Sequence, residues 1–500
     1  MKSVEYLSIL AATVLFVRPA CAQLPAYDHV VVVIEENHSF GQIIGSSSAP
    51  NINALAAQGA NITNASNDPQ GNISGSHAVR HPSQPNYLEF YSGSNQGVLT
   101  DSHPGTSSEP LSSPPPFNTP NLGAALRNAG FTFATYSEDL PSVGFDGDSA
   151  GGSPGYQRKH NPVANWMNDA NPTANQLPST VNQPFTTFQQ IAASPGGFAN
   201  LPTVSFVVPN QIDDMHDGTI QQGDAWLKTN IIDTYLPWAR THNSLLIVTW
   251  DEDGTDTATN QIATIFAGAN IKPGNYTETN LNLNNPHVGS PIEPGIQTPT
   301  GTAMNHYNVL ATIEDIYALA HIGGAANRPG LSDIFVSAVS RKVHGGAGNF
   351  DVSLPLIGPA GIECRTGGAA GDYQIVVNFG VRVTFASVQV TGNATISSTN
   401  TNGKTVVINL TGVANAQTIR VTLGGVNDGN TTSDLTIPMS ILAGDTTADG
   451  VVNSTDIAQT KSQSGAAVSS TNFREDVTAD GNINSADIGL TKSKSGTGLP

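Results

Sequence analysis

The run His29-Val-Val-Val-Val-Ile34 is followed at once by Glu35-Glu36-Asn37. An unbroken series of β-branched residues is typical of a strand buried on both faces, as in the parallel sheet of an α/β protein. The acidic pair after it places carboxylates at the carboxyl end of the strand, where open α/β sheets bind their ligands. This stretch therefore predicts the fold class and the edge of the sheet at which function should be sought.

Three further apolar runs end in polar clusters of the same kind. They are 244–250, followed by Asp251-Glu252-Asp253; 131–136, followed by Ser137-Glu138-Asp139; and 203–208, followed by Asn210, Asp213, Asp214, His216 and Asp217. Amphipathic stretches such as 121–128 and 225–240 alternate with these runs, which predicts a largely parallel sheet flanked by helices. The four clusters should meet at one edge of that sheet, and facing carboxylates repel unless a cation lies between them, so we expect a divalent metal site. The alternative for each cluster is that its acids cap the next helix or face water.

The composition restricts the class of partner. The 500 residues include 39 acidic and 20 basic side chains, for a net charge of −19. Such a charge repels a phosphate backbone, so we do not expect sequence-independent binding of nucleic acid. Apolar residues make up 38% of the chain, which is too many for disorder, and 50 Gly with 32 Pro indicate many loops. We expect a globular protein of about two to four domains.

A candidate nucleophile lies in His81-Pro-Ser-Gln-Pro-Asn-Tyr-Leu88. A serine hydroxyl is a weak nucleophile until a base or a metal lowers its pKa. The two prolines stiffen the backbone around Ser83, which suits a fixed attacking group. Pro-Ser-x-Pro also occurs in ordinary loops, so the motif gains weight only beside the acidic clusters.

Four separated motifs now carry a resemblance. Glu36-Asn37-His38-Ser39-Phe40, the 81–88 motif, Val248-Thr-Trp-Asp-Glu252 and His306 together resemble the phosphoesterase family of bacterial acid phosphatases and phospholipases C. The resemblance covers roughly 27–335 and implies the fold of the alkaline-phosphatase-like superfamily. The His-Pro-Ser-Gln-Pro-Asn-Tyr form is similar to the acid-phosphatase branch. It implies a phosphomonoesterase, with a phospholipase C or a non-catalytic assembly or adhesion protein as the alternatives.

The resemblance also implies a role for each motif residue. A divalent metal would be held by Glu36, Asn37, Asp251 and Glu252, and Ser83 would be the nucleophile that becomes phosphorylated. Asn86 and Asp214 would bind the substrate, while His216 and His306 would assist the leaving alcohol or the attacking water. His306 could instead be an ordinary residue at the start of a helix.

The C-terminal end contains a repeated twelve-residue loop. Asp445-Thr-Thr-Ala-Asp-Gly-Val-Val-Asn-Ser-Thr-Asp456 recurs as Asp476-Val-Thr-Ala-Asp-Gly-Asn-Ile-Asn-Ser-Ala-Asp487. Oxygen-bearing side chains recur at the same loop positions with a glycine at the sixth, the pattern of a calcium loop. The expected ligands are Asp445, Thr447, Asp449, Asn453 and Asp456 in the first loop, and Asp476, Thr478, Asp480, Asn484 and Asp487 in the second. The segment resembles a type I dockerin, which implies two bound Ca²⁺ and a cohesin-type partner.

The rest of the chain completes the predicted organisation. Alternating or β-branched runs at 373–379, 405–410 and 418–423 predict a small β-sandwich, in which no aromatic cluster indicates carbohydrate binding. Residues 1–22 have the basic start, apolar stretch and Ala20-Cys21-Ala22 site of a signal peptide, too short to be a transmembrane anchor. We therefore expect a secreted, periplasmic or cell-surface protein. Its parts would be a signal peptide (1–22), a phosphoesterase domain (23–342), a β-sandwich spacer (350–443) and a dockerin-like domain (444–500).

Overall fold

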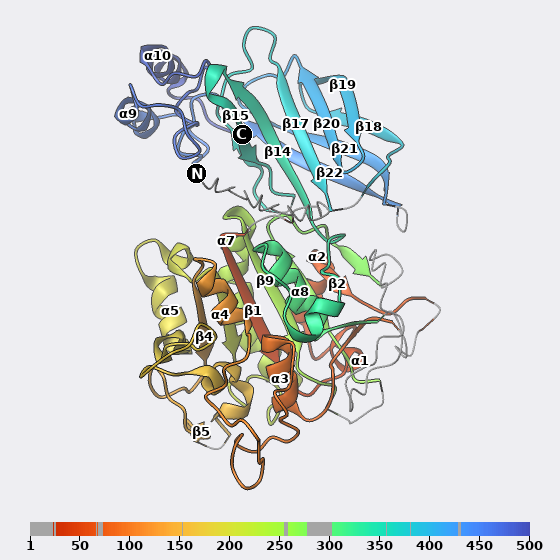
Figure 1. Cartoon of the computed structure of the whole chain (residues 1–500). Helices are drawn as coiled ribbons and strands as arrows, with labels where there is room; N and C mark the ends of the chain where they lie inside the picture. The colour runs from red at the N-terminus through yellow and green to blue at the C-terminus, as the bar shows by residue number, and fades with distance from the viewer. Residues whose placement is uncertain are drawn as a thin grey trace, which may run out of the picture.

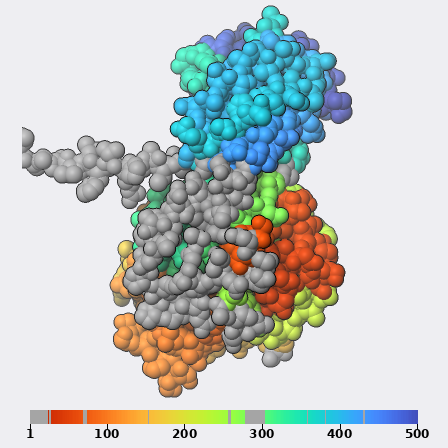
Figure 2. Space-filling view, turned by 90° about the vertical axis from the view of Figure 1, so that its right-hand side faces the viewer, coloured from red at the N-terminus to blue at the C-terminus, as the bar shows by residue number. Residues whose placement is uncertain are grey.

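The computed structural model describes residues 24, 27–66, 68, 74–152, 154–254, 259–277, 303–356, 358–380, 382–428 and 432–500. The predicted signal peptide lies outside the described residues. An α/β part forms one end of the molecule, and a β-sandwich with two C-terminal helices forms the other (Figure 1). The view at a right angle shows the same two-part arrangement (Figure 2). Among the described residues, no helix combines the length and apolar character needed to cross a bilayer.

The α/β part is built on an eight-stranded sheet with the order β12-β2-β11-β9-β1-β8-β4-β7. Its strands are β1 (His29–Glu35), β2 (Ala60–Ile62), β4 (Phe133–Ser137), β7 (Asn182–Pro184), β8 (Val204–Val208), β9 (Ser244–Trp250), β11 (Thr264–Gly268) and β12 (Gly274–Tyr276). The five strands from β9 to β7 pair in parallel, whereas β11 runs antiparallel to β9 and to β2. The predicted α/β class with a largely parallel sheet is confirmed.

Helices cover both faces of this sheet. This explains why the middle of β1, from Val30 to Ile34, is entirely apolar. Val30, Val32 and Ile34 belong to a core shared with α3 (Ser83–Ser92), α4 (Leu122–Asn128) and α8 (His306–Ile316). Val31 and Val33 belong to the opposite core, which includes α1 (Phe40–Ile43), α2 (Pro50–Gln58), α5 (Phe185–Ala193), α6 (Ile220–Leu227) and α7 (Tyr235–Thr241). Successive side chains of a strand point to opposite faces, so burial of both faces requires apolar residues at every position.

Short elements connect these pieces. They are β3 (Ser76–His77), β10 (Gln261–Ile262) and β13 (Met304–Asn305) in a three-stranded sheet, β5 (Ser149–Ala150) with β6 (Tyr156–Gln157), the 3₁₀ helices η1 (Arg158–His160), η2 (Pro162–Trp166), η3 (Ser179–Val181), η4 (Gly197–Asn200) and η6 (Gly323–Asn327), and the π-helix η5 (Lys228–Ile232). The predicted amphipathic stretch 225–240 is therefore a succession of α6, η5 and α7 rather than one helix.

The second part is a β-sandwich of two sheets around its own core. The sheet orders are β15-β14-β17-β20-β19 and β16-β22-β21-β18. The strands are β14 (Val336–His344), β15 (Gly348–Ser353), β16 (Gly361–Glu363), β17 (Tyr373–Phe379), β18 (Ser387–Thr391), β19 (Thr395–Asn402), β20 (Thr405–Thr411), β21 (Gln417–Asn427) and β22 (Thr432–Ile441), with the 3₁₀ helix η7 (Gly345–Ala347) before β15. β14 begins before the expected boundary at 342, and its Val336 and Ala338 belong to the sandwich core. We therefore propose that the spacer unit begins at Val336.

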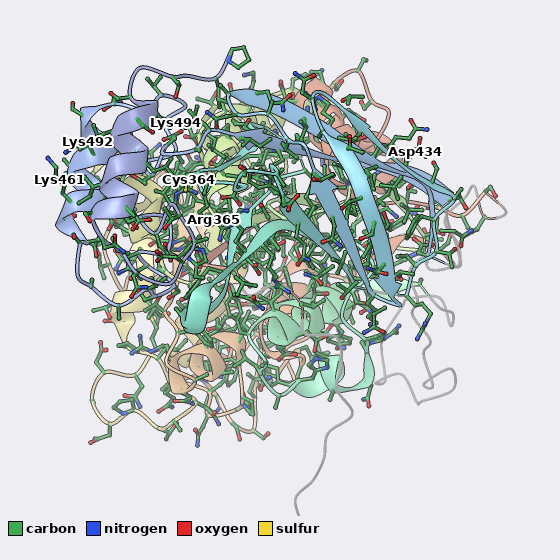
Figure 3. The ribbon with its side chains drawn as sticks, turned by 90° about the horizontal axis from the view of Figure 1, so that it is seen from above. Cys364, Arg365, Asp434, Lys461, Lys492 and Lys494 are labelled. Carbon is green, nitrogen blue, oxygen red and sulfur yellow. The ribbon has the colours of Figure 1, made fainter. Side chains whose placement is uncertain are left out.

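The C-terminal helices α9 (Ser454–Ser462) and α10 (Ser485–Lys494) lie side by side beside the sandwich (Figure 3). Their loops are attached to the sandwich by buried contacts. His344 Nδ1 at the end of β14 lies 2.8 Å from Asp476 Oδ2, and both side chains are fully buried. The rings of Phe350 and Phe473 stack at 5.5 Å, with an interplanar angle of 7°. The C-terminal module is thus packed on the sandwich.

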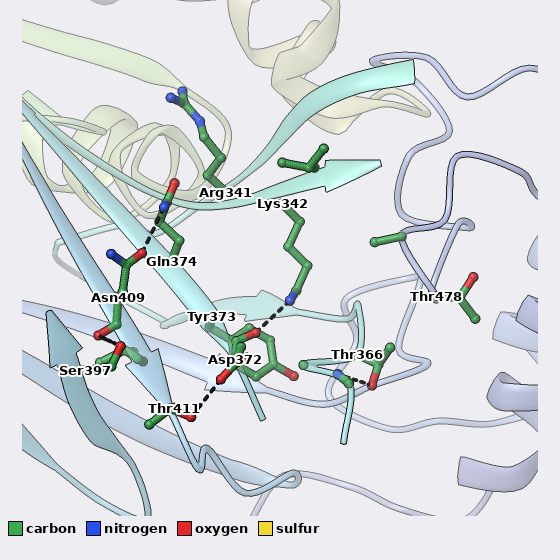
Figure 4. A pocket seen from close by; sticks show the side chains of 15 residues that line it. Arg341, Lys342, Thr366, Asp372, Tyr373, Gln374, Ser397, Asn409, Thr411 and Thr478 are labelled. Carbon is green, nitrogen blue, oxygen red and sulfur yellow. Dashed lines mark hydrogen bonds between the residues drawn. The ribbon is translucent and has the colours of Figure 1, made fainter. Parts of the chain in front are cut away.

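An open hollow of about 690 Å³ lies where the sandwich meets the second of the repeated C-terminal loops, 476–487 (Figure 4). Its polar side chains pair with one another. Gln374 Nε2 donates to Asn409 Oδ1 (2.9 Å), and Lys342 Nζ donates to Asp372 O (2.9 Å) while lying 4.2 Å from the centroid of the Tyr373 ring. This mutual pairing accounts for the polar lining without a bound molecule.

The His344–Asp476 contact leads to a stability prediction. We expect His344→Ala to lower the free energy of unfolding by about 1–3 kcal/mol, because a buried hydrogen bond to a charged group is lost. The measurement is thermal unfolding of the full chain in calcium. The control is Val343→Ala at the neighbouring position, whose side chain is 63% exposed, so its effect should be small. Equal melting temperatures for the two variants would contradict a stabilising contact.

Candidate active site

The carboxyl ends of β1, β8 and β9 bring three of the acidic clusters together. Asp251 N donates to Glu35 O (3.0 Å), and Glu36 N donates to Asp214 O (2.8 Å). These backbone bonds continue beyond the paired strands and hold Glu36, Asp214 and Asp251 at one edge of the sheet. In the fourth cluster, Glu138 accepts hydrogen bonds from the indole of Trp226 and the backbone N–H of Asn210. Glu138 of the fourth cluster therefore holds neighbouring segments together, next to the three clusters that meet.

Ser83 is the first residue of α3, and its hydroxyl lies between two carboxylates. Its Oγ is 3.1 Å from Glu36 Oε2 and 3.1 Å from Glu252 Oε1, so either carboxylate can accept its proton. The side chain is buried. The first turn of a ten-residue helix also favours negative charge, because of the helix dipole. Ser83 therefore lies where a serine could accept and hold a phosphoryl group.

Asn86 shapes the loop that carries Ser83. Its Oδ1 accepts from Val79 N (3.1 Å) and Arg80 N (3.0 Å), and its Nδ2 donates to Arg80 O (2.6 Å). The same Nδ2 lies 3.4 Å from Glu252 Oε2. These contacts make Asn86 a positioning residue for the loop, and its role as a substrate ligand stays a prediction.

The carboxylates at this edge are buried and close enough to disfavour one another's charge. Burial, and then the neighbouring charge of Glu252, raise the pKa of Asp251 to about 8. Burial and then Asp251 raise the pKa of Glu36 well above its ordinary value, and the same two causes act on Asp214. A cation among these groups would remove the repulsion and favour their charged forms.

The donor atoms fit such a cation. Asn37 Oδ1 and Asp251 Oδ2 are buried and have no hydrogen-bond partner among the described residues. Asn37 adopts a φ of 51°, and its backbone N–H donates to the other carboxylate oxygen of Asp251 (3.1 Å). Gly254 packs so closely that a Cβ there would lie 1.9 Å from Asn37 O. Unpaired hard oxygens in a fixed arrangement are suitable ligands for a divalent cation, although they do not identify which one.

Two site residues were missed by the sequence analysis, and both lie on η1. His160 Nε2 is 3.1 Å from Glu36 Oε1, its Nδ1 is 3.6 Å from Asp214 Oδ2, and its ring stacks on Tyr87 with centroids 5.1 Å apart. Glu36, His160 and Asp214 each offer one ligand atom, and these atoms lie within 4.8 Å of one another. Asp214, expected to bind substrate, thus lies in a second group of metal-type donors.

Lys159 supplies a positive charge beside this group. Its Nζ is 2.9 Å from Asp101 Oδ2. Burial disfavours the charged form of Lys159, but the facing carboxylates of Asp101 and Glu36 raise its pKa overall. The sequence signal for both residues is the basic run Arg158-Lys159-His160, which is unusual in a chain with few basic residues.

The two predicted catalytic histidines lie in different surroundings. His216 is 26% exposed, and its backbone N–H donates to Asp214 Oδ1 (2.8 Å). Its Nδ1 lies 2.9 Å from Asp217 Oδ1, and its ring centroid is 6.1 Å from that of His160. His216 therefore borders the acidic edge and is accessible from solvent.

His306 is buried at the start of α8. Its Nε2 lies 3.0 Å from Trp250 O, and its ring stacks on Phe90 with centroids 5.5 Å apart. Burial lowers its pKa to about 4, so the ring is neutral at ordinary pH. These contacts describe a residue that supports the backbone just before Asp251, and its catalytic role stays a prediction.

The two C-terminal loops have nearly the same internal geometry. In the first, Asp445 accepts from the backbone N–H groups of Asp449 (3.2 Å) and Gly450 (2.9 Å), and Asp456 accepts from that of Thr447 (3.0 Å). The second loop repeats these bonds through Asp476 and Asp487. Asp445, Asp449 and Asp456 also present ligand atoms within 4.8 Å of one another. This arrangement of oxygens around one point fits a calcium ion.

One expected calcium ligand in each loop also caps the helix that follows the loop. The side-chain oxygens of Asn453 and Asn484 accept from the backbone N–H groups two residues ahead (2.7 Å in both) and cap α9 and α10. The remaining expected ligands, Thr447 and Asp449 in the first loop and Thr478 and Asp480 in the second, lie inside their loops.

Comparison with known proteins identifies relatives of both ends of the chain. A model of the phosphoesterase family matches residues 73–320, and a model of the dockerin type I domain matches residues 443–494. The phosphatidylinositol-3-phosphatase of Mycobacterium tuberculosis is 42% identical over 316 residues, which cover 63% of this chain and 85% of that protein. An acid phosphatase of Aspergillus fumigatus is 26% identical over 277 residues, covering 55% of this chain and 52% of the relative.

Matches among solved structures include a protein of the alkaline phosphatase superfamily from Vibrio parahaemolyticus. It has a TM-score of 0.35 and 11% identity, covering 67% of this chain and 81% of the other. The alkaline phosphatase of the Antarctic bacterium TAB5 has a TM-score of 0.29 and 11% identity, covering 59% and 99% of the respective chains.

Proposed function

The chain belongs to the phosphoesterase family and is a hydrolase of phosphate esters, and on that premise we propose that it is a secreted, metal-dependent phosphomonoesterase that acts through a phosphorylated Ser83. The monoester preference is supported by relatives named phosphatidylinositol-3-phosphatase and acid phosphatase. Secretion is supported by the dockerin domain, since proteins that contain one are typically extracellular.

The position of Ser83 carries the proposal. Its hydroxyl lies 3.1 Å from a carboxylate oxygen on each side, at the edge of the sheet where Glu36, Asp214 and Asp251 meet. A buried serine beside such bases can lose its proton as it attacks phosphorus. The Oγ–P bond forms while the bond from phosphorus to the leaving alcohol breaks, and water then releases phosphate from Ser83.

The surrounding residues would divide the remaining tasks. Asn37 and Asp251 present unpaired oxygens that would hold the metal, with Glu36 and Glu252 beside them. A divalent cation bound there would act as a Lewis acid that offsets the charge of the phosphate dianion. Lys159, which is paired with Asp101, lies at the same edge.

The partly exposed His216 would protonate the leaving alcohol. The backbone contact of His216 with Asp214 places the residue at the acidic edge, and the access of its side chain to solvent suits a group that exchanges protons with water.

The C-terminal domain would attach the enzyme to a partner. A dockerin domain implies calcium binding and an interaction with a cohesin. Both loops have the required oxygens in place, which supports two bound Ca²⁺. The enzyme would therefore act while held in an assembly outside the cell.

Removing divalent metal should abolish turnover. We expect EDTA to lower hydrolysis of p-nitrophenyl phosphate by at least about 100-fold, because little other positive charge faces the phosphate, and addition of a divalent cation should restore it. Since EDTA also removes calcium from the C-terminal loops, the control is the full-length Asp456→Ala, Asp487→Ala variant. It should lose calcium binding in calorimetry and keep its turnover. Full activity of the native chain after exhaustive chelation would refute metal dependence.

The monoester assignment is tested by comparing substrates. Purified, metal-loaded protein should hydrolyse p-nitrophenyl phosphate faster than it hydrolyses bis-p-nitrophenyl phosphate or releases phosphocholine from phosphatidylcholine vesicles. A preference for either diester would indicate a phospholipase C or another phosphodiesterase instead.

A further inference from the structure

A cavity of about 430 Å³ is lined by residues that neighbour Ser83 and His160 in the sequence. Its wall includes Gln84, the residue after Ser83, and Lys159, the residue before His160. Asp101 connects these two walls, because one of its carboxylate oxygens accepts from Gln84 N (2.9 Å) and the other lies 2.9 Å from Lys159 Nζ. The cavity wall therefore joins the two segments that contain Ser83 and His160.

The other walls come from two loops that the reaction itself does not use. One is the Ser- and Pro-rich loop after α3, represented by Ser102, His103, Thr106 and Ser108. The other is the segment before η1, represented by Asp148 and Gln157. Gln84 Nε2 donates to Thr100 O (2.7 Å) and Ser102 O (2.8 Å), which fixes the first loop against the start of α3.

All the lining residues have polar side chains, and their charges nearly balance. Every described residue of the wall has a hydroxyl, amide, imidazole or charged side chain. The charged groups are already paired: Lys159 with Asp101, Arg158 with Asp146 (2.7 Å), and His103 with Asp148. An acyl chain in the cavity would remove water from the hydroxyl and amide groups of the wall, at a large free-energy cost. A second phosphate group on the substrate would meet only cations whose charge is already balanced by Asp101 and Asp146.

We propose that this cavity is the leaving-group subsite, and that it selects phosphate monoesters of neutral, polyhydroxylated alcohols such as sugars and polyols. The proposal rests on the phosphomonoesterase function of the Ser83 site. The alcohol hydroxyls would exchange hydrogen bonds with Ser108, Thr106 and Gln157, while the phosphate lies at Ser83. Substrates whose alcohol is apolar would lack these bonds and would leave the cavity's polar groups unsatisfied.

The test compares two monoesters of six-carbon primary alcohols, sorbitol phosphate and hexyl phosphate. For the native, metal-loaded chain we expect kcat/KM to be at least about tenfold higher for sorbitol phosphate. Ser108→Leu should reduce that ratio by about tenfold, because it replaces a hydroxyl of the wall with an apolar side chain. Gln157→Leu tests the opposite wall and should shift the ratio in the same direction.

Ser107→Leu is the matched control. Ser107 is an exposed neighbour that does not line the cavity, so its variant should keep the native ratio. A ratio near one in the native chain, or an unchanged ratio in both wall variants, would overturn the subsite while hydrolysis of p-nitrophenyl phosphate upholds the enzyme. Absence of turnover on all three monoesters would overturn the proposed function and the subsite together.

Discussion

Replacing Ser83 with alanine is expected to lower kcat on p-nitrophenyl phosphate by at least about 10³-fold, since a covalent mechanism cannot proceed without its nucleophile. The hydroxyl donates to the site carboxylates of Glu36 and Glu252 rather than to the backbone of the sheet, so the fold should survive its removal. Steady-state kinetics measures the loss of kcat, and far-UV circular dichroism tests whether the fold is retained. Acid-quenched native enzyme should also show a phosphate adduct on Ser83 in mass spectrometry, and the variant should not.

Ser92→Ala is the matched control for this variant. Ser92 ends the same helix, is buried like Ser83, and donates to backbone carbonyls rather than to carboxylates. It should keep native turnover. A Ser83→Ala enzyme with more than about one tenth of native kcat would mean that another group attacks phosphorus.

Glu363→Ala is expected to lower the stability of the sandwich by about 3–5 kcal/mol, because it leaves the Arg365 guanidinium buried without its carboxylate. Both side chains are fully buried. Arg365 Nε donates to Glu363 Oε1 (2.8 Å) and Nη2 donates to Oε2 (2.7 Å), while Nη1 lies 2.9 Å from His344 Nε2. Differential scanning calorimetry of the full chain should show the sandwich transition at a much lower temperature.

A neighbouring ion pair provides the control, with the same geometry but different burial. Arg341 binds Asp351 through Nε (2.8 Å) and Nη2 (2.7 Å), but the side chains are 35% and 34% exposed. Asp351→Ala should therefore cost no more than about 1 kcal/mol. Similar losses for the two variants would show that burial does not set the strength of the Glu363–Arg365 pair.

The Glu363–Arg365 pair also makes the stability of the sandwich depend on pH. Burial disfavours the charged form of Glu363, but Arg365 and the hydroxyl of Ser340 lower its pKa below the ordinary value overall. A carboxyl group with a lowered pKa in the folded state stabilises the protein above its unfolded pKa, and this contribution is lost as pH falls through the lowered value. The native sandwich should therefore lose stability on the acidic side, and Glu363→Ala should remove that part of the dependence.

Local pattern was a sufficient guide wherever neighbouring residues decide the structure. The run at 29–34 predicted a strand buried on both faces, and β1 is that strand at the centre of the sheet. The repeated loops at 445–456 and 476–487 predicted two similar turns, and their hydrogen bonds repeat almost one for one. In both cases the information lies within about a dozen residues, because strand periodicity and loop turns are local properties.

Contacts between distant segments were not predictable in this way. Lys159 and His160 belong to a basic run on a short 3₁₀ helix, but the run does not reveal that the fold brings this helix to the edge of the sheet, where His160 contacts Glu36. Asn86 carries a motif position, but its contacts serve the loop before Ser83. The position of β14, which begins at Val336, likewise depends on pairing with β17, about forty residues later.

The sequence alone determined the class of sheet, the acidic residues at the ends of its strands and the two repeated C-terminal loops of this protein. All of these follow from short-range patterns of burial and of polar atoms. Only the tertiary structure decided which acids face one another, that His306 is buried beside Trp250 O, and that a cavity opens between Gln84 and Lys159. The physical reason is that charge repulsion, desolvation and cavity shape depend on distances through space, and the chain sets those distances only when it is folded.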